Sequence, residues 1–224
     1  MGVITVGIGD ARVSNQPEDL LVTHALGSCI AVAIHDGAAG VAGLLHILLP
    51  DSKSSPGRSA THPCLFADTG IPALFHAAYA LGAQKSRATV RLVGGAQVLD
   101  PHSLFNIGRQ NYLACRRILW AAGVLISGEE VGGEISRSVR LAVASGRLEW
   151  NSSGGPGREL VARSRQAPAA ARTSEPTPAV CAQLAACRDY LNTGADPGRC
   201  PDVPLGARAH APWCADCVLR RGGR

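Results

Sequence analysis

The chain has 224 residues, of which 46% are hydrophobic, so it is long enough to bury the core of one domain and to carry a tail. Aromatic residues make up only 4%, so the core must rest on Val, Leu, Ile and Ala. The formal charge of +5 is uneven: residues 1–155 carry twelve basic and eleven acidic side chains, and residues 156–224 carry ten arginines and six acids. The near-neutral first part excludes the basic footprint of a nucleic-acid-binding domain.

The sequence shows no pattern of export or membrane insertion. Met1–Asp10 has no basic residue before its apolar stretch, which argues against a signal peptide. No uninterrupted apolar run reaches the length of a membrane span, and Arg116 and Arg117 interrupt the best candidate. We therefore expect a cytoplasmic protein whose eight cysteines are mostly reduced thiols.

The first third of the chain is predicted to consist of strands. Val3–Ile8 is predicted as a strand, residues 14–19 as a turn and Leu20–Thr23 as extended chain. Apolar runs then lie on both sides of Asp36–Gly40, which is the pattern of a β-hairpin with a short loop.

The register of this hairpin decides whether a thiol and an imidazole meet. With residues 36–39 as the loop, Cys29 lies opposite His46. A slip of two residues keeps both side chains on one face as diagonal neighbours, and a slip of one places them on opposite faces. Two of the three registers therefore bring the two side chains together at the open end of the hairpin.

Such a pair has a chemical use, because a thiolate is a nucleophile and a neighbouring imidazole can take the proton of the thiol. Gly27 and Ser28 precede Cys29, so the backbone can bend sharply there and direct N–H groups at a developing oxyanion. From the hairpin alone, a buried structural cysteine is the alternative interpretation, since free cysteines are among the most buried residues.

The rest of the first 155 residues alternates between helices and strands. Residues 51–63 are predicted as a loop, and Asp68 is predicted to cap a helix that ends at Leu81. Asn106 is predicted to cap a second helix that ends at Ala122. The predicted strands of this part are Thr89–Val93, Leu125–Ser127, Ser138–Val143 and Arg147–Trp150.

Hairpin strands with two helices between them favour an α+β fold over an alternating βαβ fold. At Asn151–Gly157 the composition becomes linker-like, and residues 156–224 hold eight of the fourteen prolines and no lysine. We expect a single domain at residues 1–155 and a largely disordered tail at residues 156–224.

Metal binding is the main competing chemistry. In the tail, Cys214 and Cys217 have the spacing of a zinc knuckle, to which Cys200 or His210 would add ligands, but a second close pair is lacking. In the domain, Cys29 and His46 would need His24 or His35 as a third ligand, and His35 lies at the far turn of the hairpin. We therefore predict no metal at Cys29 and His46, and no cofactor.

Several motifs follow one another in a fixed order. They are Thr-x-x-Leu-Gly-Ser-Cys at Thr23–Cys29, His-x-x-Leu-Pro-Asp-Ser at His46–Ser52, Gly-Gly-Ala at Gly94–Ala96, Asn106–Asn111, and Glu130–Gly133 continuing through Arg137–Val139. Together they resemble the CheD family, the chemoreceptor glutamine deamidases of bacterial chemotaxis. The resemblance covers about residues 3–150. It implies a layered α/β/β sandwich with mixed and antiparallel strands.

The resemblance also implies a reaction and its residues. Cys29, His46 and Thr23 match the catalytic residues of the family. Cys29 would attack a glutamine side chain of a chemoreceptor cytoplasmic domain and form a thioester, while backbone N–H groups near Gly27 and Ser28 stabilise the oxyanion. His46 would take the thiol proton and protonate the departing ammonia, and Thr23 would orient His46 or support the loop.

The sequence departs from the family pattern at one place near Cys29, and a second function is compatible with the motifs. At His24–Ala25 the family usually has an apolar residue and glycine, so this departure concerns the shape of the approach to the site and not the nucleophile. The alternative is a non-catalytic or dual-role binding module that regulates a CheC-type chemotaxis phosphatase. The intact Thr23, Cys29 and His46 favour the enzyme.

Overall fold

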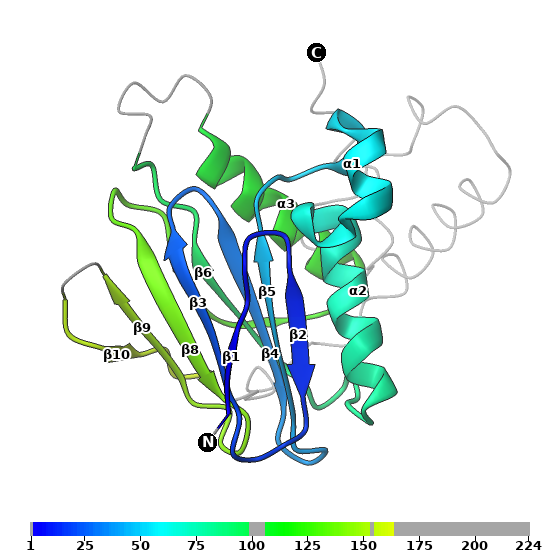
Figure 1. The fold of residues 1–224 in the computed structure, drawn as a ribbon, viewed down its shortest axis with the longest axis vertical. Helices are drawn as coiled ribbons and strands as arrows, with labels where there is room; N and C mark the ends of the chain where they lie inside the picture. The colour runs from blue at the N-terminus through cyan, green and yellow to red at the C-terminus, as the bar shows by residue number, and fades with distance from the viewer. Residues whose placement is uncertain (1, 99–105, 153–154, 164–224) are drawn as a thin grey trace, which may run out of the picture. The chain divides into compact units, whose positions relative to one another are not determined.

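The computed structural model describes residues 2–98, 106–152 and 155–163, all of them within a compact unit that runs from Met1 to Arg165 (Figure 1). Two five-stranded sheets form this unit. The first sheet has the order β1-β3-β8-β9-β10, with β1 Val3–Thr5, β3 Leu20–Leu26, β8 Arg137–Ala142, β9 Leu148–Ser152 and β10 Arg158–Glu159. The second has the order β2-β5-β4-β6-β7, with β2 Ala11–Ser14, β5 Val41–Ile47, β4 Ile30–Asp36, β6 Thr89–Gly94 and β7 Ile126–Val131.

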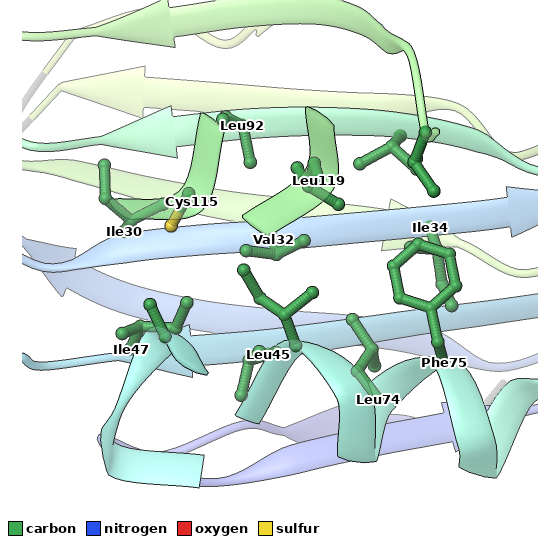
Figure 2. Close-up of a cluster of buried hydrophobic side chains, with 14 of the residues drawn as sticks. Ile30, Val32, Ile34, Leu45, Ile47, Leu74, Phe75, Leu92, Cys115 and Leu119 are labelled. Atoms are coloured by element: carbon green, nitrogen blue, oxygen red, sulfur yellow. The ribbon is translucent and has the colours of Figure 1, made fainter. Parts of the chain in front are cut away.

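Two long helices cover the outer face of the second sheet, namely α2 Ala67–Ala80 and α3 Ile107–Ala121. Figure 2 shows Ile30, Val32 and Ile34 of β4 pointing toward side chains of these helices, including Leu74 and Leu119. The result is three layers, helices on sheet on sheet, with mixed and antiparallel pairing. The predicted α+β class and the layered α/β/β sandwich are confirmed.

Strand β4 lies in the middle of the molecule and is buried on both faces, which explains its uninterrupted apolar sequence. While Ile30, Val32 and Ile34 face the helices, Ala31 and Ala33 face the other sheet. Small side chains at the sheet interface let the two sheets approach closely, and larger side chains of the first sheet, such as Leu21, fill the space between them.

The central hairpin is formed by β4 and β5, with Ile30 paired to Ile47 and Asp36 paired to Val41. Its loop is therefore residues 37–40, and the register predicted from a loop at residues 36–39 is wrong by two residues. Because Ala31 pairs with His46, Cys29 and His46 are diagonal neighbours on the face that points to the first sheet. The structure thus has the alternative register, shifted by two residues, in which Cys29 and His46 share one face of the sheet.

Several of the predicted elements are confirmed. Strand β6 covers the predicted Thr89–Val93, and β8 and β9 form the predicted second hairpin. Helix α3 begins after Asn106, whose side-chain oxygen accepts a hydrogen bond from the backbone N–H of Arg109 at 3.3 Å. The cap at this helix is therefore also confirmed.

Two predictions between β5 and α2 are wrong. Residues 51–63 are not a plain loop, because they contain the short turn η1 Ser52–Ser54, the helix α1 Pro56–Thr61 and the start of the turn η2 Pro63–Leu65. Asp68 does not cap α2, since the helix begins after Phe66. The Asp68 carboxylate instead accepts hydrogen bonds from the backbone N–H and the hydroxyl of Ser52, the latter at 2.7 Å.

The last strand, β10, lies beyond the boundary expected at residue 155. It pairs with β9, and Leu160 packs against the core between the sheets. The guanidinium of the buried Arg91 donates to the carbonyls of Leu160 and Gly146. Residues 158–163 thus belong to the folded unit, whereas Cys200, His210, Cys214 and Cys217 lie outside the described residues. In the described ranges, no helix has the length and apolar character needed to cross a membrane.

Candidate active site

Three side chains singled out in the sequence lie in the region where the two sheets meet. Thr23 comes from β3 of the first sheet, His46 comes from β5 of the second sheet, and Cys29 directly precedes β4. All three are buried, with exposed fractions of 0% for Thr23, 1% for His46 and 6% for Cys29. The site is therefore built across the sheet interface rather than on a surface loop.

The hydrogen bonds of Thr23 define which nitrogen of His46 carries a proton. The Thr23 hydroxyl donates to the carbonyl of Val6 at 2.7 Å, and the same oxygen lies 2.7 Å from His46 Nδ1. A hydroxyl has one proton, so with that proton on Val6 it must accept from Nδ1–H. The tautomer inferred in this way leaves His46 Nε2 as an unprotonated acceptor, and the buried Nε2 has no hydrogen-bond partner among the residues that the structure describes.

Burial keeps both groups of the thiol–imidazole pair neutral. It lowers the pKa of His46 from 6.5 to about 4. It also raises the pKa of the Cys29 thiol, an effect only partly offset by the hydrogen bond from the backbone N–H of Cys29 itself. Near neutral pH, Cys29 is therefore a thiol and His46 a neutral imidazole.

The lowered pKa of His46 predicts acid sensitivity of the fold. The unfolded chain binds a proton on His46 below pH 6.5 and the folded chain only below about pH 4, so stability is lost as the pH falls through this window. The full loss attributable to His46 is about 3 kcal/mol. Urea unfolding at a series of pH values from about 7 to about 5 measures the upper part of this loss.

The control for this measurement is His46→Gln, which removes the titrating ring. Burial also lowers the pKa of His35, which contributes in the same direction, so the difference between the parent and His46→Gln isolates His46. Identical pH dependence in the two proteins would show that the imidazole is not held neutral in the fold.

The segment that carries Cys29 is held by its carbonyl groups. The carbonyls of residues 27, 28 and 29 accept hydrogen bonds from Ala96 N at 2.7 Å, from Asn111 Nδ2 at 2.9 Å and from Gly95 N at 2.7 Å. Gly94 has a φ of +119°, and a Cβ at this position would collide with the Cys29 carbonyl. The glycine pair after β6 is thus required for the close approach that fixes the nucleophile segment.

The backbone N–H groups of this segment differ in their availability. Gly27 N–H donates to the carbonyl of Ala25 at 2.9 Å, so it is committed within the chain. The backbone N–H of Cys29 favours the thiolate and so lowers the pKa of its own thiol, although burial has the larger effect. An oxyanion formed on a carbon bonded to the sulfur would lie close to this N–H group.

Ala25 has a left-handed backbone, with a φ of +56°, at an irregularity in the pairing of β3 with β8. This is the position where the family resemblance implies glycine. The alanine therefore keeps the backbone shape that glycine adopts freely, at a conformational cost of roughly 1 kcal/mol.

A cavity of about 480 Å³ opens beside the nucleophile segment. Gly27 and Ser28 line it on one side, and Ala96, Val98 and Ile107 contribute a largely apolar wall. Cys29 itself is nearly closed to solvent and does not line this cavity, which borders the two residues that precede it.

Other titratable groups have structural partners. Glu129 accepts from the Tyr112 hydroxyl at 3.1 Å, and Glu130 forms an ion pair with Arg137 at 3.0 Å. His35 lies near the Val143 carbonyl at 3.1 Å. Among the described residues, no group of three or more His, Cys, Asp or Glu side chains is arranged to hold a metal ion.

The sequence interpretation missed the functional placement of Asn111. Asn111 was named as the last residue of the motif Asn106–Asn111, and the structure places it fully buried on α3. The detectable signal was a polar amide within an otherwise apolar stripe. Its two hydrogen bonds to backbone carbonyls, at Ser28 and Leu48, join segments that are far apart in the sequence.

Fold and site together define an α/β/β sandwich protein with a thiol and a free imidazole between its sheets. A family model described as "CheD chemotactic sensory transduction" matches residues 48–152. The probable chemoreceptor glutamine deamidase CheD 1 of Syntrophus aciditrophicus is 51% identical over 160 residues, which cover 71% of this chain and 100% of the relative. The chain belongs to the CheD family.

Two further relatives agree with this assignment. The probable chemoreceptor glutamine deamidase CheD of Solibacter usitatus is 49% identical over 161 residues, which cover 72% of this chain and 95% of the relative. The probable chemoreceptor glutamine deamidase CheD 2 of Anaeromyxobacter dehalogenans is 48% identical over 152 residues, covering 68% and 96% of the two chains. The family resemblance seen in the sequence motifs is confirmed.

Proposed function

We propose that this chain is a protein-glutamine deamidase that converts specific glutamines of chemoreceptors to glutamate in bacterial chemotaxis. The observation that carries the proposal is the hydrogen bond between Thr23 and His46, which leaves an unprotonated nitrogen on the same sheet face as the Cys29 thiol. The names of the relatives, probable chemoreceptor glutamine deamidases, supply the substrate class.

The reaction follows from this arrangement as cysteine-dependent amide hydrolysis. Cys29 Sγ attacks the carboxamide carbon of the glutamine while His46 Nε2 takes the thiol proton. The amide oxygen becomes an oxyanion that accepts hydrogen bonds from the backbone N–H groups of Ser28 and Cys29. Collapse of this intermediate breaks the C–N bond, and His46 returns the proton to the departing ammonia.

The second half of the reaction releases glutamate. The thioester on Cys29 is attacked by water, from which His46 Nε2 removes a proton, and breakage of the C–S bond restores the thiol. Thr23 holds the imidazole in the required tautomer through both halves, because its hydroxyl is already committed to Val6. The mechanism uses only groups of the chain itself.

The electrostatics of the site match a nucleophile that is activated only with substrate bound. Burial disfavours both the thiolate and the imidazolium, so the pair stays neutral in the empty site. The thiol proton then moves to His46 as the Cys29 sulfur attacks the amide carbon. The amide oxygen becomes negatively charged, and the backbone N–H groups stabilise this charge.

The structure favours catalysis over the alternative of a CheC-type phosphatase-binding module without activity. The Thr23–His46 bond, which orients a buried imidazole, supports catalysis, whereas the cavity beside Gly27 and Ser28 is compatible with either function. We therefore propose chemoreceptor cytoplasmic domains as the protein substrate. Binding of a CheC-type phosphatase is the alternative that the experiment below tests.

The direct test is co-expression with the cytoplasmic domain of a chemoreceptor from the same organism, followed by peptide mass spectrometry. The expected result is amide-to-acid conversion at particular glutamines. The same receptor domain expressed alone gives the spontaneous background, which falls mainly on asparagine rather than glutamine. If no cognate receptor domain is converted while a CheC-type phosphatase is bound, the binding-module interpretation replaces the proposal.

A further inference from the structure

Asn111 of α3 is a fully buried amide in a helix face that otherwise packs in the apolar core. Burial of an amide is unfavourable unless its hydrogen bonds are satisfied. Its Nδ2 donates to the Ser28 carbonyl and to the Leu48 carbonyl, both at 2.9 Å. A single side chain thus connects two backbone segments that are distant in sequence.

These two segments flank the thiol and the imidazole. The ladder between β4 and β5 ends with the pair Ile30 and Ile47, so Cys29 and Leu48 are the first residues beyond it. Ser28 directly precedes Cys29, and Leu48 follows His46 by two residues. Beyond the end of the ladder, the Asn111 amide joins the two segments through its hydrogen bonds to Ser28 and Leu48.

Two glycines bring α3 close enough for this link. A Cβ at Gly108, in the first turn of α3, would collide with the carbonyl of Gly95. Gly95 is itself bonded through its N–H to the Cys29 carbonyl. The helix therefore lies directly against the turn that holds the nucleophile segment, one turn before Asn111.

The orientation of the Asn111 amide is fixed by its partners, because the opposite orientation would place its oxygen against two carbonyl oxygens. Asn111 Oδ1 is then buried and has no hydrogen-bond partner within the described part of the chain. An unpaired buried acceptor destabilises a fold. Helix packing alone therefore does not explain an asparagine at position 111. The two hydrogen bonds from Nδ2 offset the free-energy cost of the unpaired Oδ1.

We propose that Asn111 is a positioning residue that sets the separation of the Cys29 thiol and the His46 imidazole. This inference rests on the proposed deamidase function. Asn111→Leu has a similar volume and lacks both donors, so the two flanking segments separate and kcat falls about 100-fold with little change in KM. Asn111→Asp keeps the shape, and its buried carboxyl donates one hydrogen bond only when protonated.

The experiment has one readout that needs no receptor substrate. The rate at which iodoacetamide alkylates Cys29 is measured against pH in the full chain, with the modified peptide identified by mass spectrometry. In the parent, the imidazole assists the thiol, whereas Asn111→Leu loses this assistance and is alkylated only at higher pH. Asn111→Asp recovers part of the parental rate, relative to Asn111→Leu, as the pH is lowered.

The matched control is Arg117→Leu on the exposed face of the same helix, which is expected to keep the parental kcat and alkylation profile. Urea unfolding checks that each variant is folded, and Asn111→Asp decides the question if Asn111→Leu does not fold. A parental kcat and a parental alkylation profile in the Asn111 variants would overturn the inference. If the parent converts no receptor glutamine but alkylation still depends on Asn111, the proposed function fails and the positioning role stands.

Discussion

Replacing Cys29 with alanine is expected to reduce glutamine conversion to the background of the receptor domain alone, a loss of about 10⁴-fold or more. The thiol is the only group in the proposed mechanism that bonds to the substrate. His46 and the backbone N–H groups of Ser28 and Cys29 remain in this variant, but they cannot form the thioester. Mass spectrometry of the co-expressed receptor domain measures the loss at each glutamine.

Two further variants test whether the loss of activity is due to the Cys29 thiol itself. Cys29→Ser keeps the size of the side chain and replaces the thiol with a poorer nucleophile, so it is expected to be nearly as inactive. Cys64→Ala is the matched control, because Cys64 is a partly buried cysteine packed on the helix side of the second sheet. If Cys29→Ala converts receptor glutamines as the parent does, Cys29 is a structural residue and the mechanism is wrong.

Replacing His46 with glutamine is expected to lower kcat by about 10³-fold, since both proton transfers of the reaction depend on Nε2. The KM for the receptor domain is expected to change little, because the imidazole is buried between the sheets and lies 1% exposed. Steady-state rates on a purified receptor domain separate the two constants. A large rise in KM with unchanged kcat would contradict the role of a general base.

Thr23→Val provides the comparison for this variant. It keeps the shape of the side chain and removes the hydroxyl that accepts from His46 Nδ1 and donates to Val6. The imidazole is still present, so the expected loss is smaller than in His46→Gln. An equal loss in the two variants would mean that the tautomer set by Thr23 is as important as the imidazole itself.

The sequence identified the three side chains of the site but not the register that joins them. The glycines of the loop at Gly37–Gly40 are compatible with several turns, so the local pattern leaves the pairing open. In the fold, Asp36 is the last residue of β4, and its carboxylate forms an ion pair with Arg87 at 2.8 Å. That partner lies far along the chain, and no local periodicity reveals it.

The remaining errors have the same origin in long-range contacts. Asp68 has the composition of a helix cap, but its carboxylate is taken by Ser52, which lies in the preceding segment. The strand at Arg158–Glu159 has a weak pattern of its own; it pairs with β9, and the following Leu160 packs on the core and accepts a hydrogen bond from the buried Arg91. By contrast, the cap at Asn106 was predictable, because its acceptor and donor lie three residues apart.

The bond between Thr23 and His46 also has a consequence for when activity first arises during synthesis. The hairpin that carries Cys29 and His46 is local, whereas the strand that carries Thr23 is stabilised by β8, in which Val139 pairs with Thr23. Such distant pairings form late, after the ribosome has released most of the domain. In the proposed mechanism, the Cys29 thiol therefore acquires its oriented base only after β8 has paired with β3.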